Sequence, residues 1–205
     1  MLIVELQIVI GLIVYGMFKM DTIEQKVYNT NKFLFELNLE KNLKEITLIG
    51  DNELTIGHID APVSIIMYSK FSCSYCKEFF TNSFPKLDSQ FIKTNKVKLT
   101  IRYLISSSSQ QSGLVQLAYK SQANGSFREF LELTHELGRD PEDLRLQVAE
   151  KLGIDISSPD LYDWSLLNEA RAAGIRKTPT FILDGVQYVG LPEGDLFKNK
   201  IEDLL

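Results

Sequence analysis

Residues 63–80 read VSIIMYSKFSCSYCKEFF and carry the strongest structural signal in the chain. The apolar run 63–68 has the length and composition of a buried β-strand. The residues from Lys77 onward are typical of a helix opening. Cys73 and Cys76, the two cysteines of the chain, therefore lie where a strand passes into a helix. A thiol pair two residues apart at such a junction indicates a redox centre.

The start of a helix stabilises a thiolate. Its first backbone N–H groups have no partner within the helix, and they carry the positive end of the helix dipole. Cys73 is therefore expected to be the exposed nucleophile, and Cys76 the thiol that resolves a mixed disulfide by attacking it. Lys70 and Lys77 add positive charge nearby.

Zinc binding and a structural disulfide are the alternatives for this pair. Zinc needs two further ligands, and His58 and His135 lack the spacing of a zinc finger. We expect His135 to be a solvated helix residue. A disulfide across so short a loop would remove little entropy from the unfolded chain. No metal is expected, and no cofactor beyond a redox-active Cys73–Cys76 disulfide.

Composition limits the class of partner. The chain has 205 residues and a formal net charge of −5. This length suffices for one domain with an insertion. No basic stripe with interleaved aromatic residues occurs in the sequence, which argues against nucleic acid as a partner.

The N-terminal segment is apolar. Residues 8–18 contain no charge, and Glu5 lies near the end of the run. No basic residue precedes the run and no Ala-x-Ala site follows it, so we favour an uncleaved membrane anchor over residues 1–20 to a cleaved signal peptide. A buried or self-associating helix and a mis-assigned start codon are the alternatives. Together with the redox pair, an anchor predicts the periplasmic side of the cell envelope.

Residues 21–45 are expected to form an amphipathic helical stalk. Their apolar residues recur at near-helical spacing among Asn, Lys and Glu, and they are Ile23, Val27, Leu34, Leu37 and Leu43. The stalk either packs on the following domain, joins a second copy into a homo-oligomer, or stays solvated.

Residues 46–205 are expected to form an α/β domain that begins with a βαβ unit. The unit comprises strand 63–68, a helix from Cys73 to about Lys93, and strand 97–103, which implies parallel pairing. Pro85 should kink the helix in its middle.

The rest of this domain is expected to be helical and then to return to the sheet. Residues 106–159 indicate an inserted helical region. Two strands, 180–183 and 186–189, flank Asp184-Gly185, a dipeptide typical of a type I′ hairpin turn. Apolar residues between Leu196 and Leu205 predict a closing helix.

With these motifs in order, the chain resembles the DsbA-like branch of the thioredoxin superfamily from about Ile56 to Leu205. The motifs that carry the resemblance are Gly57 with Ala61-Pro62-Val63, Phe71-Ser72-Cys73-Ser74-Tyr75-Cys76-Lys77, Gly125-x-Phe127, Gly174-Ile175-Arg176-Lys177-Thr178-Pro179-Thr180-Phe181, and Asp184-Gly185 followed by Gly190. The resemblance implies a thioredoxin fold with an inserted helical subdomain.

The resemblance also implies the residues that bind substrate. The Thr178–Pro179 bond is expected to be cis and to face the redox pair, which leaves neighbouring backbone groups free for an extended substrate strand beside Cys73. Ser74 and Tyr75, between the cysteines, are expected to complete the substrate-binding residues.

Two departures from the family concern charge. Many relatives carry a buried acid where this chain has Met67, so proton transfer from the resolving thiol is expected to be slower or to use water. A second acid of many relatives is replaced by Lys70. Lys70 is expected to tune the acidity of the pair by favouring the Cys73 thiolate, which would make the disulfide more oxidising.

The sequence thus predicts a thiol:disulfide oxidoreductase that forms disulfides in secreted or envelope proteins. Its partners would be thiol-containing proteins of that compartment and a membrane redox partner, either a quinone-linked oxidase or a thiol reductase. A reductase or isomerase of the same fold is the first alternative. A non-catalytic module that binds Cu(I) or a peptide is the second, although the histidine that copper-delivery relatives use near the later strands is missing.

Overall fold

The computed structural model describes residues 19–34, 36–38, 53–106, 108–136, 141–157, 166–192 and 195–205. The chain divides into two compact units, residues 1–42 and residues 43–205.

The larger unit is built on a five-stranded sheet with the order β1-β3-β2-β4-β5. Its strands are β1 (Leu54–Ile56), β2 (Val63–Ser69), β3 (Val97–Tyr103), β4 (Thr180–Leu183) and β5 (Val186–Val189). β2 and β3 pair in parallel, as the predicted βαβ unit requires, whereas the other neighbours are antiparallel. This arrangement confirms the predicted α/β fold class.

The turn between β4 and β5 has the predicted geometry. Asp184 and Gly185 both have positive φ angles, 52° and 72°. A two-residue loop with two positive φ angles is the type I′ turn, whose twist matches that of the strands it joins. The turn pairs β4 with β5, and the other edge of β4 pairs with β2, the strand that leads to the cysteines.

A helical run follows Cys73 and changes its hydrogen bonding around Pro85. It comprises α2 (Ser74–Glu78), η1 (Phe79–Ser83), α3 (Phe84–Leu87) and η2 (Asp88–Ile92). The Phe84 N–H donates to the Phe79 carbonyl, five residues back. Because Pro85 has no N–H to donate, a wider π-type turn before it accommodates the proline. The expected disturbance of the helix thus takes the form of π-helical turns.

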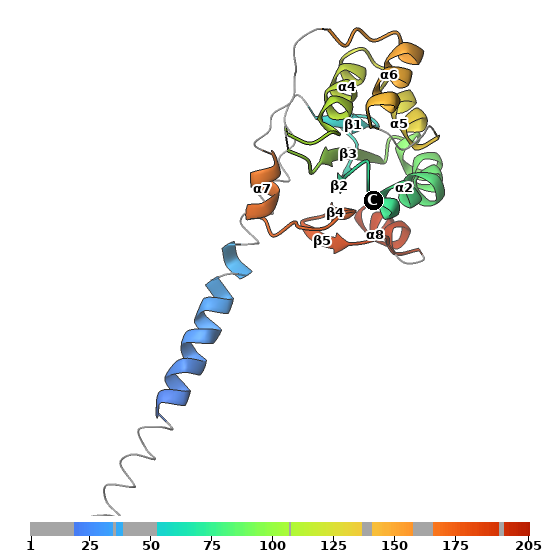
Figure 1. Ribbon diagram of the computed structural model, residues 1–205. Coiled ribbons are helices and arrows are strands. Elements are labelled where there is room, and N and C mark those ends of the chain that lie inside the picture. Colours follow the sequence, from blue (N-terminus) through green and yellow to red (C-terminus); the bar gives the residue numbers. More distant parts are fainter. Residues whose placement is uncertain are drawn as a thin grey trace, which may run out of the picture. The chain divides into compact units, whose positions relative to one another are not determined.

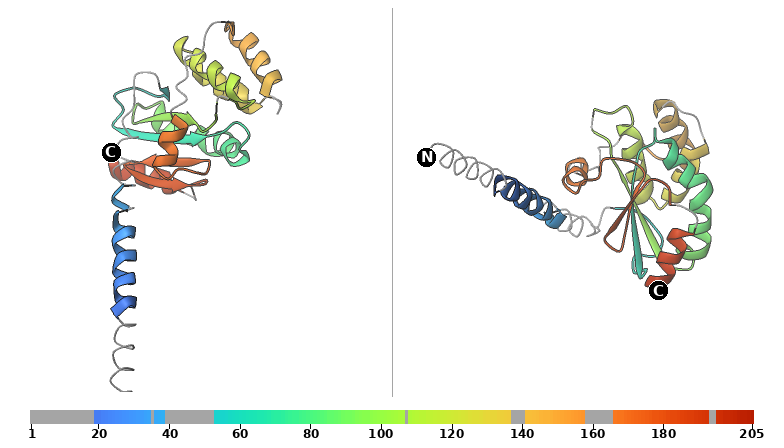
Figure 2. Two further views of the ribbon diagram at one scale, coloured as in Figure 1. Left: turned by 60° about the vertical axis from the view of Figure 1, so that its left-hand side comes forward. Right: turned by 90° about the horizontal axis from the view of Figure 1, so that it is seen from below.

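The two faces of the sheet are covered by different elements (Figures 1 and 2). One face packs on the run from α2 to η2 and on α8 (Leu196–Leu204), with Val63, Ile65 and Met67 of β2 in the main core. The opposite face packs on α7 (Leu166–Ala172), with Ile66 and Tyr68 of β2 in a second, smaller core. The alternation along β2 is the period of two that a pleated strand imposes.

Three helices form the insertion between β3 and α7. They are α4 (Ser112–Ala123), α5 (Phe127–Glu136) and α6 (Pro141–Leu152), which gather beyond β1 in Figure 1. The buried carboxylate of Asp88 in η2 connects these helices to the helical run after Cys73, because it pairs with Arg128 of α5 at 2.8 Å. The same carboxylate also pairs with Lys93, at the end of η2, at 3.2 Å. The insertion is therefore fixed to the helix that carries Cys76.

Two elements were absent from the sequence-based expectation. β1 has only three residues, too few for alternation to be read, and it extends the sheet by pairing with β3. α7 has seven residues, of which Leu166 and Ala170 are buried. Both elements are too short to show a clear pattern in the sequence, and both are stabilised by contacts with other elements.

The smaller unit contains an N-terminal helix over residues 19–34 and 36–38. This helix agrees with the helical part of the predicted stalk, whereas residues 39–45 lie outside the described residues. The predicted anchor over residues 1–20 falls almost wholly on residues that are not described. Within the described ranges, no helix combines the length and apolar character needed to span a bilayer.

Candidate active site

Cys73 lies at the N-cap of α2, where β2 ends and the helical run begins. Its backbone is extended, with φ −86° and ψ 113°, and its sulfur accepts a hydrogen bond from the Cys76 N–H at 3.2 Å. The Cys73 N–H donates to the Lys70 carbonyl at 3.2 Å, which closes the turn between strand and helix. A sulfur in this position receives one of the N–H groups that a helix leaves unpaired at its start. The Cys73 sulfur is thus held at the start of the helical run by the Cys76 N–H.

The Thr178–Pro179 segment lies against Cys73. The bond between these two residues is cis, which confirms the prediction from the family resemblance. The Cys73 thiol donates to the Thr178 carbonyl at 3.3 Å, across 105 residues of sequence. Beyond the proline, the Pro179 carbonyl accepts the Gly190 N–H at 2.8 Å, so the segment continues directly into the β4–β5 pairing.

Cys76 is buried, with 1% of its surface exposed, among Met67, Phe79 and Tyr103. Burial, together with the hydrogen bond to Cys73, raises the pKa of the Cys76 thiol to about 12. The Ser69 hydroxyl and the Lys70 backbone N–H hydrogen-bond the Cys76 sulfur and act in the opposite direction. Cys76 is therefore a neutral thiol in this state, in which both cysteines are free.

The other predicted site residues differ in their exposure. Tyr75 is 60% exposed and Ser74 is exposed, so both face solvent between the two cysteines. Lys70 is partly buried and contacts the pair through its backbone carbonyl and N–H. The proposed influence of its side-chain charge on Cys73 stays a prediction.

Aromatic packing joins the active site to the inserted helices. Phe71, two residues before Cys73, stacks on Tyr103 with ring centroids 4.2 Å apart and contacts Phe130 of α5 edge-on at 6.1 Å. Stacked and edge-to-face pairs are the favoured arrangements of aromatic rings. The insertion thus helps to fix the loop that presents the cysteines.

His135 does not lie in solvent as the sequence suggested. Its ring packs on Phe80 with centroids 4.2 Å apart, and burial lowers its pKa to about 4. The two rings and Leu131 line part of a cavity of about 260 Å³ between α5 and the helical run after Cys76. The prediction failed because Phe80 is distant in sequence, so no local pattern reveals the contact.

Ser69 is a site residue that the sequence analysis missed. It ends β2 with 2% of its surface exposed, and its carbonyl accepts the Leu104 N–H at 2.9 Å. A serine at the end of an apolar run reads as the polar boundary of a strand. Only the fold shows that the Ser69 hydroxyl lies within hydrogen-bonding reach of the Cys76 thiol.

The two sulfurs of the site differ in their access to solvent. Among the described residues, no group of three or more His, Cys, Asp or Glu side chains is placed to hold a metal ion. Instead, one half-buried sulfur is accessible and hydrogen-bonded, and a second is buried beside it. This difference in access is what a two-step disulfide exchange requires.

Comparison with known proteins agrees with this arrangement. A family model described as Thioredoxin matches residues 50–203, about three quarters of the chain. The chain belongs to this thioredoxin family. Its sheet, its cysteine pair and its cis-proline segment all lie within the matched range.

Solved structures show that this thioredoxin-family chain has a DsbA-like fold. Wolbachia pipientis alpha-DsbA1 is 22% identical, with a TM-score of 0.61, over 78% of this chain and 94% of that one. A mutant of ScsC from Proteus mirabilis that carries a linker deletion is 18% identical, with a TM-score of 0.66, over 89% of this chain and 90% of that one.

A curated relative comes from Rickettsia conorii and is named "Putative protein-disulfide oxidoreductase". It is 22% identical over 161 residues, which cover 74% of this chain and 56% of the relative. The thioredoxin-family chain thus spans little more than half the length of the curated relatives it matches.

Proposed function

We propose that this chain is a thiol:disulfide oxidoreductase that exchanges disulfides between Cys73–Cys76 and protein thiols. One observation carries the proposal: the Cys73 sulfur accepts the Cys76 N–H at 3.2 Å and lies 3.3 Å from the Thr178 carbonyl. The first contact stabilises a thiolate, and the second places that sulfur beside backbone suited to hold a polypeptide. The family and the names of relatives support the same class of reaction.

The proposed oxidation of a substrate dithiol takes two steps. A substrate thiolate attacks the Cys73 sulfur of the Cys73–Cys76 disulfide, which forms a mixed disulfide and releases Cys76 as a thiolate that takes up a proton. A second substrate thiolate then attacks the substrate sulfur bound to Cys73. The substrate leaves as a disulfide, and both electrons stay on the reduced Cys73–Cys76 pair.

Different residues around the cysteine pair stabilise the thiolate that leaves in each step. The Cys76 N–H stabilises Cys73 when it leaves as a thiolate. The Ser69 hydroxyl and the Lys70 N–H stabilise the Cys76 sulfur when that group leaves. An extended substrate would lie against Ser74, Tyr75 and Thr178, which are exposed or partly exposed. Pro179, which is buried beside Thr178 in the chain, keeps the substrate-binding role first assigned to it.

The compartment and partners belong to the same proposal. We place the redox domain on the periplasmic side of the cell envelope, with secreted or envelope proteins as substrates and residues 1–20 as its membrane anchor. A separate membrane redox protein would restore the disulfide. The apolar composition of residues 8–18 and the fold of the Wolbachia and Proteus proteins support this placement.

A peptide with two cysteines and a fluorescent reporter tests the reaction. The oxidised protein should convert the peptide to its disulfide, and Cys73→Ala should abolish the reaction. Cys76→Ala, mixed with the peptide in its disulfide form, should accumulate a mixed disulfide as Cys73 attacks that disulfide, visible as an added peptide mass on non-reducing gels. Oxidation by the Cys73→Ala protein at the wild-type rate would reject the proposal.

The direction of exchange is set by the reduction potential of the pair. Equilibration with glutathione would give about −120 mV for a strong oxidase and about −270 mV for a thioredoxin-like reductant. A value near the first would support disulfide donation, and one near the second would support the reductase alternative. Refolding of a substrate with scrambled disulfides would detect isomerase activity.

A further inference from the structure

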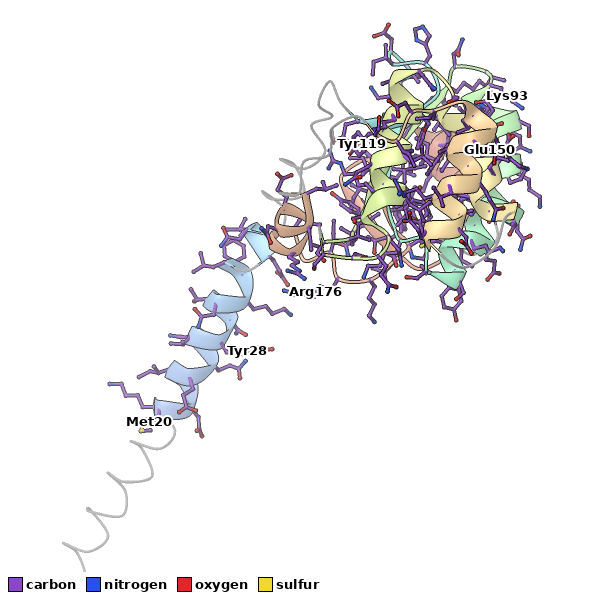
Figure 3. All side chains as sticks on the ribbon, turned by 45° about the horizontal axis from the view of Figure 1, so that its top comes forward. Met20, Tyr28, Lys93, Tyr119, Glu150 and Arg176 are labelled. Carbon is purple, nitrogen blue, oxygen red and sulfur yellow. The ribbon has the colours of Figure 1, made fainter. Side chains whose placement is uncertain are left out.

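The N-terminal helix carries an apolar stripe that the other described residues of its own unit leave uncovered. Its members are between 45% and 62% exposed, and they are Met20, Ile23, Val27, Leu34 and Leu37. Figure 3 shows Met20 and Tyr28 projecting outwards from this helix. Exposed apolar side chains that lie together on one helix mark a surface for association.

The spacing of this stripe follows a heptad repeat. Steps of three and four residues alternate through positions 20, 23, 27, 30, 34 and 37, and Thr30 is the one polar member. These are the a and d positions of a coiled coil, in which each apolar side chain fits into a hole on a facing helix. Two further exposed apolar side chains lie outside these positions, Phe33 at a g position and Tyr28 at a b position.

Charges beside the stripe select the orientation of the facing helix. Lys19 and Lys26 occupy g positions, and Glu24 occupies an e position. In a parallel pair, each g residue faces the e residue of the next heptad on the partner, so Lys19 faces Glu24 of the second copy. In an antiparallel pair, g residues face each other and the lysines would repel. The charges therefore complement a second, parallel copy of the same helix.

The helix also contains a segment of low intrinsic helix propensity. Asn29, Thr30 and Asn31 are consecutive and exposed. Isolated helices with such residues are marginal in water, and most helices gain their stability by burying an apolar face. A partner on the stripe would supply that burial.

We propose that the N-terminal helix forms a parallel coiled coil with the same helix of other copies of this chain. The assembly holds two or more redox domains together. It does not depend on the exchange reaction, so either proposal can fail alone.

The mass of the full-length protein in non-ionic detergent tests this association. After correction for bound detergent, we expect a multiple of the 23.4 kDa chain. Val27→Asp with Leu34→Asp places charge in the core of the coil and should give the mass of a single copy. The matched control, Gln25→Asp with Asn29→Asp, adds the same charge at f and c positions and should keep the wild-type mass. Circular dichroism and the glutathione equilibrium confirm that each variant is folded.

A charge exchange tests the orientation. Lys19→Glu should weaken association at low salt, and Lys19→Glu combined with Glu24→Lys should restore it. A single-copy mass for the wild type would overturn the proposal. A wild-type mass for the Val27→Asp, Leu34→Asp protein would overturn it too, since residues outside the stripe would then hold the copies together.

Discussion

The two faces of the sheet bury different kinds of polar group where β2 and β3 run side by side. Toward α2, the Ser69 hydroxyl and the Cys76 thiol are neutral and lie in apolar surroundings. On the opposite face, the 3% exposed Arg102 pairs with Glu53 at 2.6 Å and donates to the Tyr68 hydroxyl at 3.1 Å. The pKa of Cys76 on the first face is set mainly by burial and hydrogen bonds, whereas Arg102 and Glu53 on the other face form a buried ion pair.

The pleat of β3 separates these two environments. Arg102 and Tyr103 are neighbours in sequence, yet successive side chains of a strand point to opposite faces. Tyr103 therefore lies near Cys76 while the Arg102 guanidinium is directed away from it. A buried ion pair can therefore lie one residue from Tyr103 in the sheet without setting the charge at the Cys76 thiol.

The largest expected effect follows removal of the charge that balances Arg102. Glu53→Ala should destabilise the fold by about 3–5 kcal/mol, because it leaves a buried guanidinium without its carboxylate. Urea denaturation measures the loss. Asp60→Ala, which removes the exposed carboxylate 3.9 Å from His58, is the control and should change stability by less than about 1 kcal/mol. Equal losses in both variants would contradict the structural role of the Arg102–Glu53 pair.

A smaller effect concerns pH on the redox face. The folded state keeps His135 neutral, with a pKa of about 4 against the ordinary 6.5. The unfolded chain takes up the proton first, so the stabilisation is fully present above pH 6.5 and is lost as the pH falls toward 4. His135→Phe should therefore flatten the acid limb of the stability curve, by up to about 1 kcal/mol per pH unit.

Thermal unfolding of both proteins between about pH 7 and pH 4 checks the role of His135. The variant keeps an aromatic ring against Phe80, so its stability at neutral pH should stay close to that of the wild type. Parallel curves for the two proteins would mean that His135 is protonated without cost in the folded state.

The smallest expected effect lies at the hydrogen bond to the resolving thiol. Ser69→Ala should slow the escape of Cys73 from a mixed disulfide about fivefold, since a hydrogen bond of this kind contributes about 1 kcal/mol. Stopped-flow measurement across pH should show the Cys76 titration moving further upward. Ser64→Ala is a matched control on the same strand, because the Ser64 hydroxyl has no hydrogen-bond partner among the described residues. Equal slowing by both variants would assign the effect to strand packing.

The sequence predicted those parts of the molecule whose signal is local. The apolar run of β2, the Asp184-Gly185 turn and the Thr178-Pro179 dipeptide each carry their structural consequence in a few adjacent residues. The Cys73–Cys76 pair was found for the same reason. The expectation that Cys73 is the more exposed of the two agrees with its half-buried position beside the buried Cys76. The residues that share the core with Cys76 could not be predicted, because Met67, Phe79 and Tyr103 come from three separate elements.

The missed features all depend on distant partners. The hydroxyl of Ser69 is useful only because α2 brings Cys76 over the end of β2. His135 is partly buried only because α5 packs on the helical run that follows Cys73. The stripe of the N-terminal helix shows the reverse case, since its spacing is fully local while its proposed partner is a separate molecule.

The hydrogen bond from Cys73 to the Thr178 carbonyl links affinity to oxidation state. A disulfide has no S–H to donate, so oxidation of the pair frees this carbonyl to accept a backbone N–H from an arriving polypeptide. Where reduced Cys73 is protonated, its thiol donates to the same oxygen and competes with the bound chain. The oxidised form would thus bind the substrate polypeptide more tightly than the reduced form does. The exchange reaction would therefore favour release of its own product.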